Sequence, residues 1–216
     1  MLQINAMFAV PFAFEQHPDP APLNAQLRAL FLQREAEGGR YANPNPNTLR
    51  NKQLFESHFD LFDWPEPCIR QLREFCLSNL LRVVGDLNGY DLATLRRINV
   101  MTDAWFHITR RNGLFGVHNH PMAAWSGVYC VAPGSSDAGQ PESGSLSFIN
   151  PQSAHAMYLD VGNSGLKSPY GAANRGFQLV PGQLVLFPSW VLHQVMPFYG
   201  DDERITVAFN CAFQMR

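Results

Sequence analysis

The stretch His118-Asn119-His120-Pro121 is joined, much later in the chain, by His193 at the end of the run Leu186-Phe187-Pro188-Ser189-Trp190-Val191-Leu192-His193. On an extended strand, side chains two positions apart leave the same face, with Cα atoms roughly 6.5 Å apart at about 3.3 Å per residue. On a helix the same spacing would turn the two rings to nearly opposite sides. Pro121 favours the extended form, because proline restricts the preceding residue to β or polyproline geometry. The three histidines therefore predict a metal site on a β scaffold, against the alternative that histidines meet by chance in a surface loop.

Size and composition indicate one globular domain spanning residues 1–216. The chain has 216 residues, of which 46% are hydrophobic and 16% are charged, and this is enough for a substantial core. Its 16 phenylalanines predict an aromatic-rich core or an apolar pocket. The 4 cysteines include no Cys-x-x-Cys pair and are too sparse for a disulfide scaffold, so we expect them to be reduced and mostly buried.

The charge of the chain argues against several kinds of partner. A formal net charge of −2 gives no broad attraction to phosphate backbones or anionic lipids, so we expect no nucleic-acid partner. No stretch approaches the ~20 uninterrupted apolar residues of a membrane span, and residues 1–5 lack the basic region of a secretory signal. These features predict a cytoplasmic protein without membrane association. They leave a small molecule or a peptide as the expected partner. Exposed strand edges and the aromatic content are compatible with a homodimer.

Residues 1–97 predict one strand and a set of supporting helices. Residues 4–14 carry apolar side chains at a density typical of a sheet strand. In residues 22–37 the apolar positions recur at helical spacing. A second packing helix is expected over residues 65–85, with prolines near its start and a glycine at its end, and a short helix within residues 86–97.

From Ile98 onward the pattern changes to short strands separated by glycine and proline, which predicts an antiparallel sandwich or barrel. The expected strands are residues 105–108, 126–131, 145–149, 177–180, 183–187 and 204–213. Pro181-Gly182 is typical of a type II turn and predicts a hairpin that delivers residues 190–193 to the barrel mouth. Residues 151–176 form a long connection rich in Gly, Ser and Asn, as lids and binding loops often are.

A cationic residue follows the last histidine. Arg204 and Thr206 share one face of a predicted strand. An arginine on the inward side of a barrel strand is costly unless an anion meets it, so this residue predicts a carboxylate ligand held by the guanidinium and the hydroxyl. The alternative is an outward arginine paired with one of the acidic residues at 201–203.

Together these features resemble the Fe(II)/2-oxoglutarate-dependent oxygenase superfamily, and more narrowly a mainly bacterial group of uncharacterised 2-oxoglutarate (2OG) oxygenases within it. The resemblance covers roughly residues 98–213, with its motifs in the right order. The matching residues are Asn112-Gly113, His118-x-His120-Pro121, Trp125-Ser126-Gly127-Val128-Tyr129, Gly182, residues 184–190, His193 and Glu203-Arg204-Ile205-x-x-Ala208-Phe209-Asn210.

The resemblance implies a mainly β (α+β) fold: a double-stranded β-helix, or cupin-like jelly roll, over residues 98–213, buttressed by the N-terminal helices. It implies Fe(II) as the metal and 2OG as cosubstrate. His118 and His193 take the roles of the two metal-binding histidines, while Arg204, with Thr206, binds the far carboxylate of 2OG. His120 stands where most members have Asp or Glu, so the site has three imidazoles and one negative charge fewer. Glu142 and Asp160 are the nearest loop residues that could restore a carboxylate.

Other polar and aromatic residues have less specific expectations. Tyr129 is predicted to donate its phenol to the cosubstrate, or to be a core tyrosine. Packing or structural roles are expected for Trp125, Trp190, His107 and His155, ligand orientation for Asn112 and Asn210, and surface positions for His17 and His58.

The function predicted from the sequence is hydroxylation of a C–H bond by a non-haem Fe(II), 2OG-dependent dioxygenase whose catalytic metal ligands are His118, His120 and His193. Two alternatives remain open from the sequence. One is a three-histidine dioxygenase that does not use 2OG, and the other is a metal-binding or sensing jelly roll without turnover.

Overall fold

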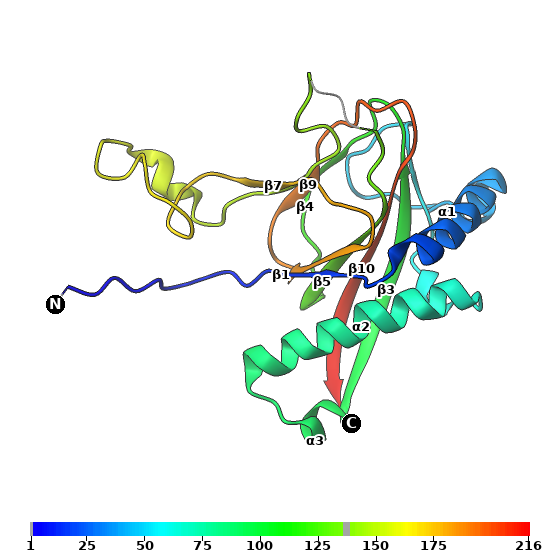
Figure 1. The fold of residues 1–216 in the computed structure, drawn as a ribbon, viewed down its shortest axis with the longest axis horizontal. Helices are drawn as coiled ribbons and strands as arrows, with labels where there is room; N and C mark the ends of the chain where they lie inside the picture. The colour runs from blue at the N-terminus through cyan, green and yellow to red at the C-terminus, as the bar shows by residue number, and fades with distance from the viewer. Residues whose placement is uncertain (1, 136–138) are drawn as a thin grey trace.

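The computed structural model describes residues 2–135 and 139–216, and the strands of these residues form two facing antiparallel sheets, as in a jelly roll (Figure 1). The larger sheet has the order β1 (Ala13–Gln16), β8 (Gln183–Pro188), β5 (Trp125–Ala132), β10 (Arg204–Met215), β3 (Ile98–Thr109) and β2 (Leu54–Glu56). The smaller sheet has the order β4 (Phe115–His118), β9 (His193–Val195), β6 (Leu146–Phe148) and β7 (Arg175–Phe177). The expected double-stranded β-helix is confirmed.

The helices lie on the side of the larger sheet that faces away from the smaller sheet (Figure 1). The α-helices are α1 (Pro20–Ala36), α2 (Pro67–Asn88) and α3 (Leu92–Leu95), and short 3₁₀ helices occupy Gly38–Arg40 and Leu61–Asp63. α1 and α2 each have proline in the first turn, where its missing N–H leaves no intrahelical bond unmade. α2 is capped at its C-terminus by Gly89, which takes a left-handed conformation (φ 68°). The three helices confirm the helical periodicity, although α2 continues beyond Gly85 to Asn88.

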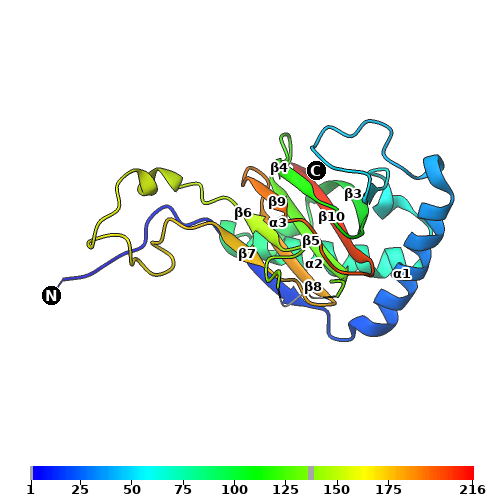
Figure 2. The same cartoon turned by 90° about the horizontal axis from the view of Figure 1, so that it is seen from above.

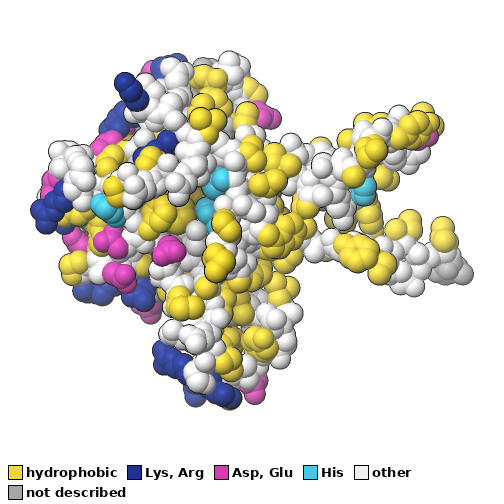
Figure 3. Space-filling view, turned by 180° about the vertical axis from the view of Figure 1, so that it is seen from behind, with side chains coloured by type: hydrophobic (Ala, Val, Ile, Leu, Met, Phe, Trp, Pro, Cys, Tyr) yellow, Lys and Arg dark blue, Asp and Glu magenta, His cyan; other side chains and the backbone are white. Residues whose placement is uncertain are grey.

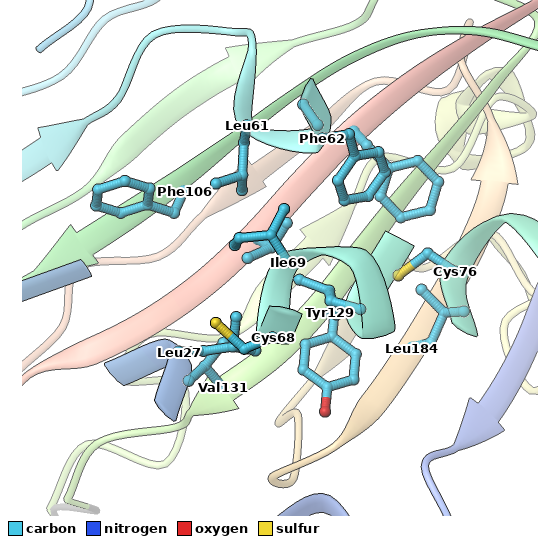
Figure 4. Packing of buried hydrophobic residues seen from close by; sticks show 14 of the residues in the cluster. Leu27, Leu61, Phe62, Cys68, Ile69, Cys76, Phe106, Tyr129, Val131 and Leu184 are labelled. Atoms are coloured by element: carbon cyan, nitrogen blue, oxygen red, sulfur yellow. The ribbon is translucent and has the colours of Figure 1, made fainter. Parts of the chain in front are cut away.

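Alternate residues of each central strand build the core beneath the helices. In β10, Ile205, Val207 and Phe209 face α1 and α2, where they join Phe106 of β3 in one cluster with the apolar stripes of both helices. Figure 4 shows part of this packing, in which helix and strand side chains interdigitate. Each fully buried large apolar side chain contributes about 1.5–3 kcal/mol, so this layer fixes the larger sheet against the helices.

The N-terminal strand is much shorter than predicted. Only β1 pairs with β8, from Ala13↔Leu186 to Gln16↔Gln183, and residues 2–12 lie outside any strand. Residues 2–9 are exposed and extend away from the sheets (Figure 1). The apolar pattern of residues 4–14 therefore overestimated the strand, because a strand also requires a neighbour to pair with.

The predicted hairpin at Pro181-Gly182 is wrong. The turn itself forms, since the Gln183 N–H donates to the Val180 carbonyl and Gly182 has a φ of 83°. However, β7 before it pairs with β6, whereas β8 after it pairs with β5 and β1. The turn thus carries the chain from one sheet to the other.

The long connection before β7 contains a 3₁₀ helix (Ser153–Met157) and projects from the edge of the smaller sheet (Figure 2). Within the described residues, no helix combines the length and apolar character needed to cross a bilayer. All 4 cysteines are free and buried, as expected. His17, expected at the surface, is instead buried with its ring 4.9 Å from that of Phe75 on α2, because β1 brings it beneath that helix.

Candidate metal centre and cosubstrate pocket

Strand pairing in the smaller sheet brings the three histidines together. His118 ends β4 and His193 begins β9, and the two are paired directly across the strands. His120 follows two residues after His118, and its backbone N–H donates to the Ser189 carbonyl. One ligand nitrogen from each ring lies within 4.8 Å of the others. Figure 3, which shows the molecule from behind the view of Figure 1, shows histidine side chains that reach the surface in a hollow.

Hydrogen bonds to backbone carbonyls set the tautomers of two of the rings. His118 Nδ1–H donates to the Gly116 carbonyl (2.8 Å), and His193 Nδ1–H donates to the Val191 carbonyl (2.9 Å). Each neutral ring therefore has its lone pair on Nε2. Metal-bound histidines are commonly oriented in this way by a bond from the other nitrogen.

Burial of the three histidine rings keeps them neutral. Burial and the neighbouring His193 and His118 lower the pKa of His120 to about 3, and burial followed by His118 lowers that of His193 to about 3. Burial also lowers the pKa of His118. Imidazoles must be deprotonated to bind a metal, so the cluster is ready to act as a ligand set at neutral pH.

The donor geometry fits one metal ion. Nε2 of His120 and Nε2 of His193 are 3.2 Å apart. Imidazole nitrogens about 2.1 Å from a metal and at right angles to each other would be separated by about 3 Å. Two neutral acceptor nitrogens at this distance repel unless a proton or a cation lies between them. Three imidazoles whose ligand nitrogens lie this close together can bind the same face of one ion, as in the facial arrangement of non-haem iron sites.

A buried guanidinium lies in the same cavity as the histidines. Arg204 is 4% exposed and points inward, with Nη1 3.5 Å from Thr206 Oγ1. Within the described part of the chain, no carboxylate is in ion-pair contact with it, and burial lowers its pKa. The acidic residues before it are turned elsewhere. Asp201 pairs with Arg111, Asp202 accepts from Ser135, and Glu203 pairs with Arg28.

Two further residues shape the surroundings of this guanidinium. Thr109 lies opposite Arg204 in the β3–β10 pairing, and its buried Oγ1 has no hydrogen-bond partner among the described residues. Gly144 has a φ of 64°, and a Cβ there would lie 2.9 Å from Arg204 Cδ. A glycine at 144 thus lets the backbone lie directly against the arginine. A buried cation beside an unpartnered hydroxyl is suited to bind an anion.

The cavity between the two sheets is narrow, with a volume of about 30 Å³, so a ligand as large as 2OG requires some lining side chains to move. Its lining residues are Trp105, His107, Phe115, His118, His120, Gly127, Val128, Leu146, Phe187, His193, Val195, Arg204, Thr206 and Ala208. Most of its wall is aromatic or aliphatic, which keeps bulk water away from the polar groups.

Tyr129, for which the sequence predicted either cosubstrate binding or a core position, does not line this cavity and belongs to the core. It lies on the helix side of β5, where its hydroxyl donates to Asn24 Oδ1 on α1 (2.8 Å). Figure 4 shows its ring among the residues packed under α2. Successive side chains of a strand alternate between faces, and Val128 is the residue of this pair that reaches the cavity.

The structure also places the other residues considered from the sequence. Glu142 and Asp160 are exposed, and neither belongs to the histidine cluster. Trp190 is exposed, and Trp125 packs against the helix-side core. Asn210 accepts a hydrogen bond from Ser126 and contacts none of the three histidines in the described hydrogen bonds.

Sequence reasoning missed Trp105 as a residue of the pocket wall and expected only a structural role for His107; both line the cavity from β3. It also missed Glu56 of β2, which contacts His107. The available signal was the alternation of Trp105 and His107 with the apolar Ala104, Phe106 and Ile108, which places the first two on one face.

Comparison with known proteins supports the fold. The prolyl-4-hydroxylase from Pseudomonas putida superposes with a TM-score of 0.61, at 17% identity, over 96% of this chain and 94% of its own. HygX from Streptomyces hygroscopicus, with nickel, 2OG and hygromycin B bound, gives a TM-score of 0.58 at 12% identity over 94% and 83%. The epimerase SnoN, in complex with Fe3+, alpha-ketoglutarate and nogalamycin RO, gives 0.60 at 11% identity over 96% and 82%. No curated protein matches the sequence.

The sequence itself matches a family model described as "Putative 2OG-Fe(II) oxygenase" over residues 103–210, which is half of the chain. The matched region contains the three histidines, Arg204 and Thr206. Iron and 2OG are the cofactor and cosubstrate of this family. The protein therefore belongs to the 2OG-Fe(II) oxygenase family and is a dioxygenase of that kind.

Proposed function

We propose that this enzyme hydroxylates a C–H bond of its substrate, with Fe(II) held by His118, His120 and His193 and with 2OG anchored by Arg204 and Thr206. The observation that carries the proposal is the placement, in a single cavity, of three neutral imidazoles and one buried guanidinium that has no carboxylate partner among the described residues. A buried cation without an anion is unfavourable, so this arrangement is suited to a ligand that carries negative charge.

The histidines supply three nitrogen ligands without needing to lose protons first. Their Nδ1–H bonds at His118 and His193 keep Nε2 aimed at the shared position. Bound Fe(II) and 2OG would supply the oxidising chemistry of the family, in which O₂ is consumed, 2OG becomes succinate and CO₂, and C–H becomes C–OH.

Arg204 would hold the far carboxylate of the cosubstrate through charge-assisted hydrogen bonds, with Thr206 as a further donor. Thr109, whose hydroxyl has no partner among the described residues, lies beside Arg204 and can donate as well. The apolar wall, including Phe115, Phe187 and Leu146, would exclude water from the reacting position.

The substrate would be a small molecule or a peptide. HygX was crystallised with hygromycin B, and another structural neighbour is a prolyl hydroxylase from Trichoplax adhaerens in complex with a peptide fragment, with a TM-score of 0.60 and 13% identity. These neighbours suggest both classes and favour neither. The connection after β6 begins beside the metal site, because the Ile149 N–H donates to the Leu192 carbonyl, and it is therefore placed to contact a substrate.

Anaerobic titration tests the proposal. Fe(II) and then 2OG are added to the protein, and the visible metal-to-ligand charge-transfer band of the chelate is recorded. We expect the band to appear with 2OG and succinate to form when O₂ is admitted with substrate. Fe(II) binding without a band would favour a three-histidine dioxygenase that does not use 2OG, and no Fe(II) binding would contradict the proposal.

A further inference from the structure

A buried carboxylate lies one residue away from the metal cavity. Glu56 of β2 is 4% exposed and is paired with His107 across β2 and β3. Its Oε2 lies 2.9 Å from His107 Nε2. Its Oε1 accepts from Asn43 Nδ2 (2.6 Å) and from Arg50 Nη1 (3.0 Å). All four side chains therefore form one network that fixes the carboxylate in place.

His107 connects this carboxylate to the metal site. Its ring lines the same cavity as the three histidines. Trp105 Nε1 lies 3.2 Å from His107 Nε2, and the Trp105 ring is 5.7 Å from that of His120. On the other side, the Phe115 ring lies 4.8 Å from His107 and 4.9 Å from His118.

The charges that Fe(II), 2OG and Arg204 would bring into the cavity show why a nearby carboxylate would stabilise metal binding. Three neutral imidazoles bring no charge, so Fe(II), the 2OG dianion and Arg204 would sum to one net positive charge. A site with Asp or Glu at position 120 would sum to zero. A net charge inside a low-dielectric cavity is costly, and a nearby opposite charge lowers that cost.

We propose that Glu56, acting through His107, supplies the negative charge that the three-histidine site lacks, and so strengthens Fe(II) binding. Glu56 is a positioning residue in this account, because it touches His107 and not the metal position. Arg50, 18% exposed in its side chain, contacts the oxygen of Glu56 that is not bound to His107. This inference rests on the proposed function, since it requires iron at the three histidines.

The ionisation of Glu56 agrees with this role. Burial raises the pKa of its carboxyl, but the bond and charge of His107, the bond from Asn43 and the charge of Arg50 outweigh burial and lower that pKa.

The test is anaerobic titration of Glu56→Gln with Fe(II), compared with the wild-type protein. Direct partners of metal ligands typically change metal affinity by about 10–100-fold. Glu56 is bonded to His107, which is not a ligand, so we expect a loss at the low end of this range, about 10-fold. Glu66→Gln is the matched control, because Glu66 also pairs with an arginine (Arg34, 2.7 Å), but Arg34, unlike His107, does not line the metal cavity. We expect its Fe(II) affinity to equal that of the wild type.

Repeating the Glu56→Gln change in the His120→Asp variant distinguishes an effect of the Glu56 charge on the metal site from a general effect on the fold. In His120→Asp the missing charge is placed directly on the metal, so adding Glu56→Gln should then weaken Fe(II) binding less than 2-fold by the same titration. Equal losses in both backgrounds, or no loss in either, would overturn the inference. If Glu56→Gln does not fold, His107→Gln, which removes the imidazole between Glu56 and the cavity, should show the same dependence on position 120. Absence of Fe(II) binding by the wild type would instead overturn the proposed function.

Discussion

The two faces of the larger sheet differ sharply in chemistry although they are built from the same strands. On the helix face, Phe106, Val207 and Phe209 meet the apolar stripes of α1 and α2. On the cavity face, the alternate positions of the same strands carry His107 and Thr206, with Arg204 nearby. The helix face is mostly apolar, with the Tyr129 hydroxyl bonded there to Asn24, whereas the cavity face buries charge and several hydrogen-bonding groups.

Stability and ligand binding therefore depend on opposite faces of one sheet. The strand period of two directs successive residues to opposite faces, so residues one position apart can serve unrelated roles. Removing a side chain from the helix face should cost stability and leave ligand binding intact. Removing one from the cavity face should affect ligand binding first.

The largest effect on stability is expected from Phe106→Ala. Phe106 is fully buried and stacks on Phe31 of α1 with ring centroids 4.2 Å apart. Its loss should lower the free energy of unfolding by about 3–5 kcal/mol, measured by urea denaturation. The Fe(II) affinity of the folded fraction should be unchanged, and a parallel loss of metal binding would contradict the separation of the two faces.

Arg204→Ala is expected to have the largest effect on the cosubstrate. Removing the guanidinium should weaken 2OG binding about 100-fold, or roughly 2.7 kcal/mol, as measured by titration of the charge-transfer band. Pyruvate, which lacks the far carboxylate, provides the control. The wild type should bind 2OG far more tightly than pyruvate, and the variant should bind both about equally. If Arg204→Ala still binds 2OG more tightly than pyruvate, the far carboxylate of 2OG is bound by a residue other than Arg204.

Acidification is expected to destabilise the metal-free protein through its histidines. The pKa values of His120 and His193 fall to about 3 in the folded protein, so below about pH 6.5 the unfolded chain binds protons that the folded one does not. The free energy of unfolding should therefore decrease as the pH falls from about 6.5 towards 3.

The variant His120→Gln isolates the contribution of one imidazole to the pH dependence of the free energy of unfolding. Between about pH 6 and pH 5, where few carboxylates titrate, the variant should lose about 1 kcal/mol per pH unit less than the wild type. Denaturation curves at these two pH values measure the difference. Identical slopes for both proteins would mean that His120 is not held in its neutral form.

The smallest effect is expected from Tyr129→Phe. This change removes the hydrogen bond to Asn24 on the helix face and should lower stability by about 0.5–1.5 kcal/mol. Affinity for 2OG should be unchanged, because the phenol lies on the opposite side of β5 from the cavity. A clear loss of 2OG affinity would restore the role expected for Tyr129 from the sequence.

Local patterns predicted much of the fold. α1 and α2 follow from the spacing of apolar residues and from the prolines in their first turns. The pairing of β7 with β6 could not be predicted, because strand partners far apart in sequence leave no mark in a local pattern. For the same reason, the residues before β1 looked like a strand although they have no strand neighbour in the structure.

The histidine pair and the inward Arg204 were visible as candidates because polar residues in an apolar strand pattern stand out. Tyr129 was assigned to the wrong face because nearly all of β5 is buried, so burial does not distinguish one side from the other. Glu56 escaped notice because β2 is only three residues long and carries too little pattern. Glu56 reaches His107 only through the pairing of β2 with β3, which the sequence pattern does not predict.

The most direct test of the account is an anaerobic crystal structure of the protein with Fe(II) and 2OG. We predict one iron bound by Nε2 of His118, His120 and His193, with no side-chain carboxylate among its ligands and with the far carboxylate of 2OG on Arg204. Iron bound by an aspartate or glutamate of the chain, or no iron between the three rings, would contradict it.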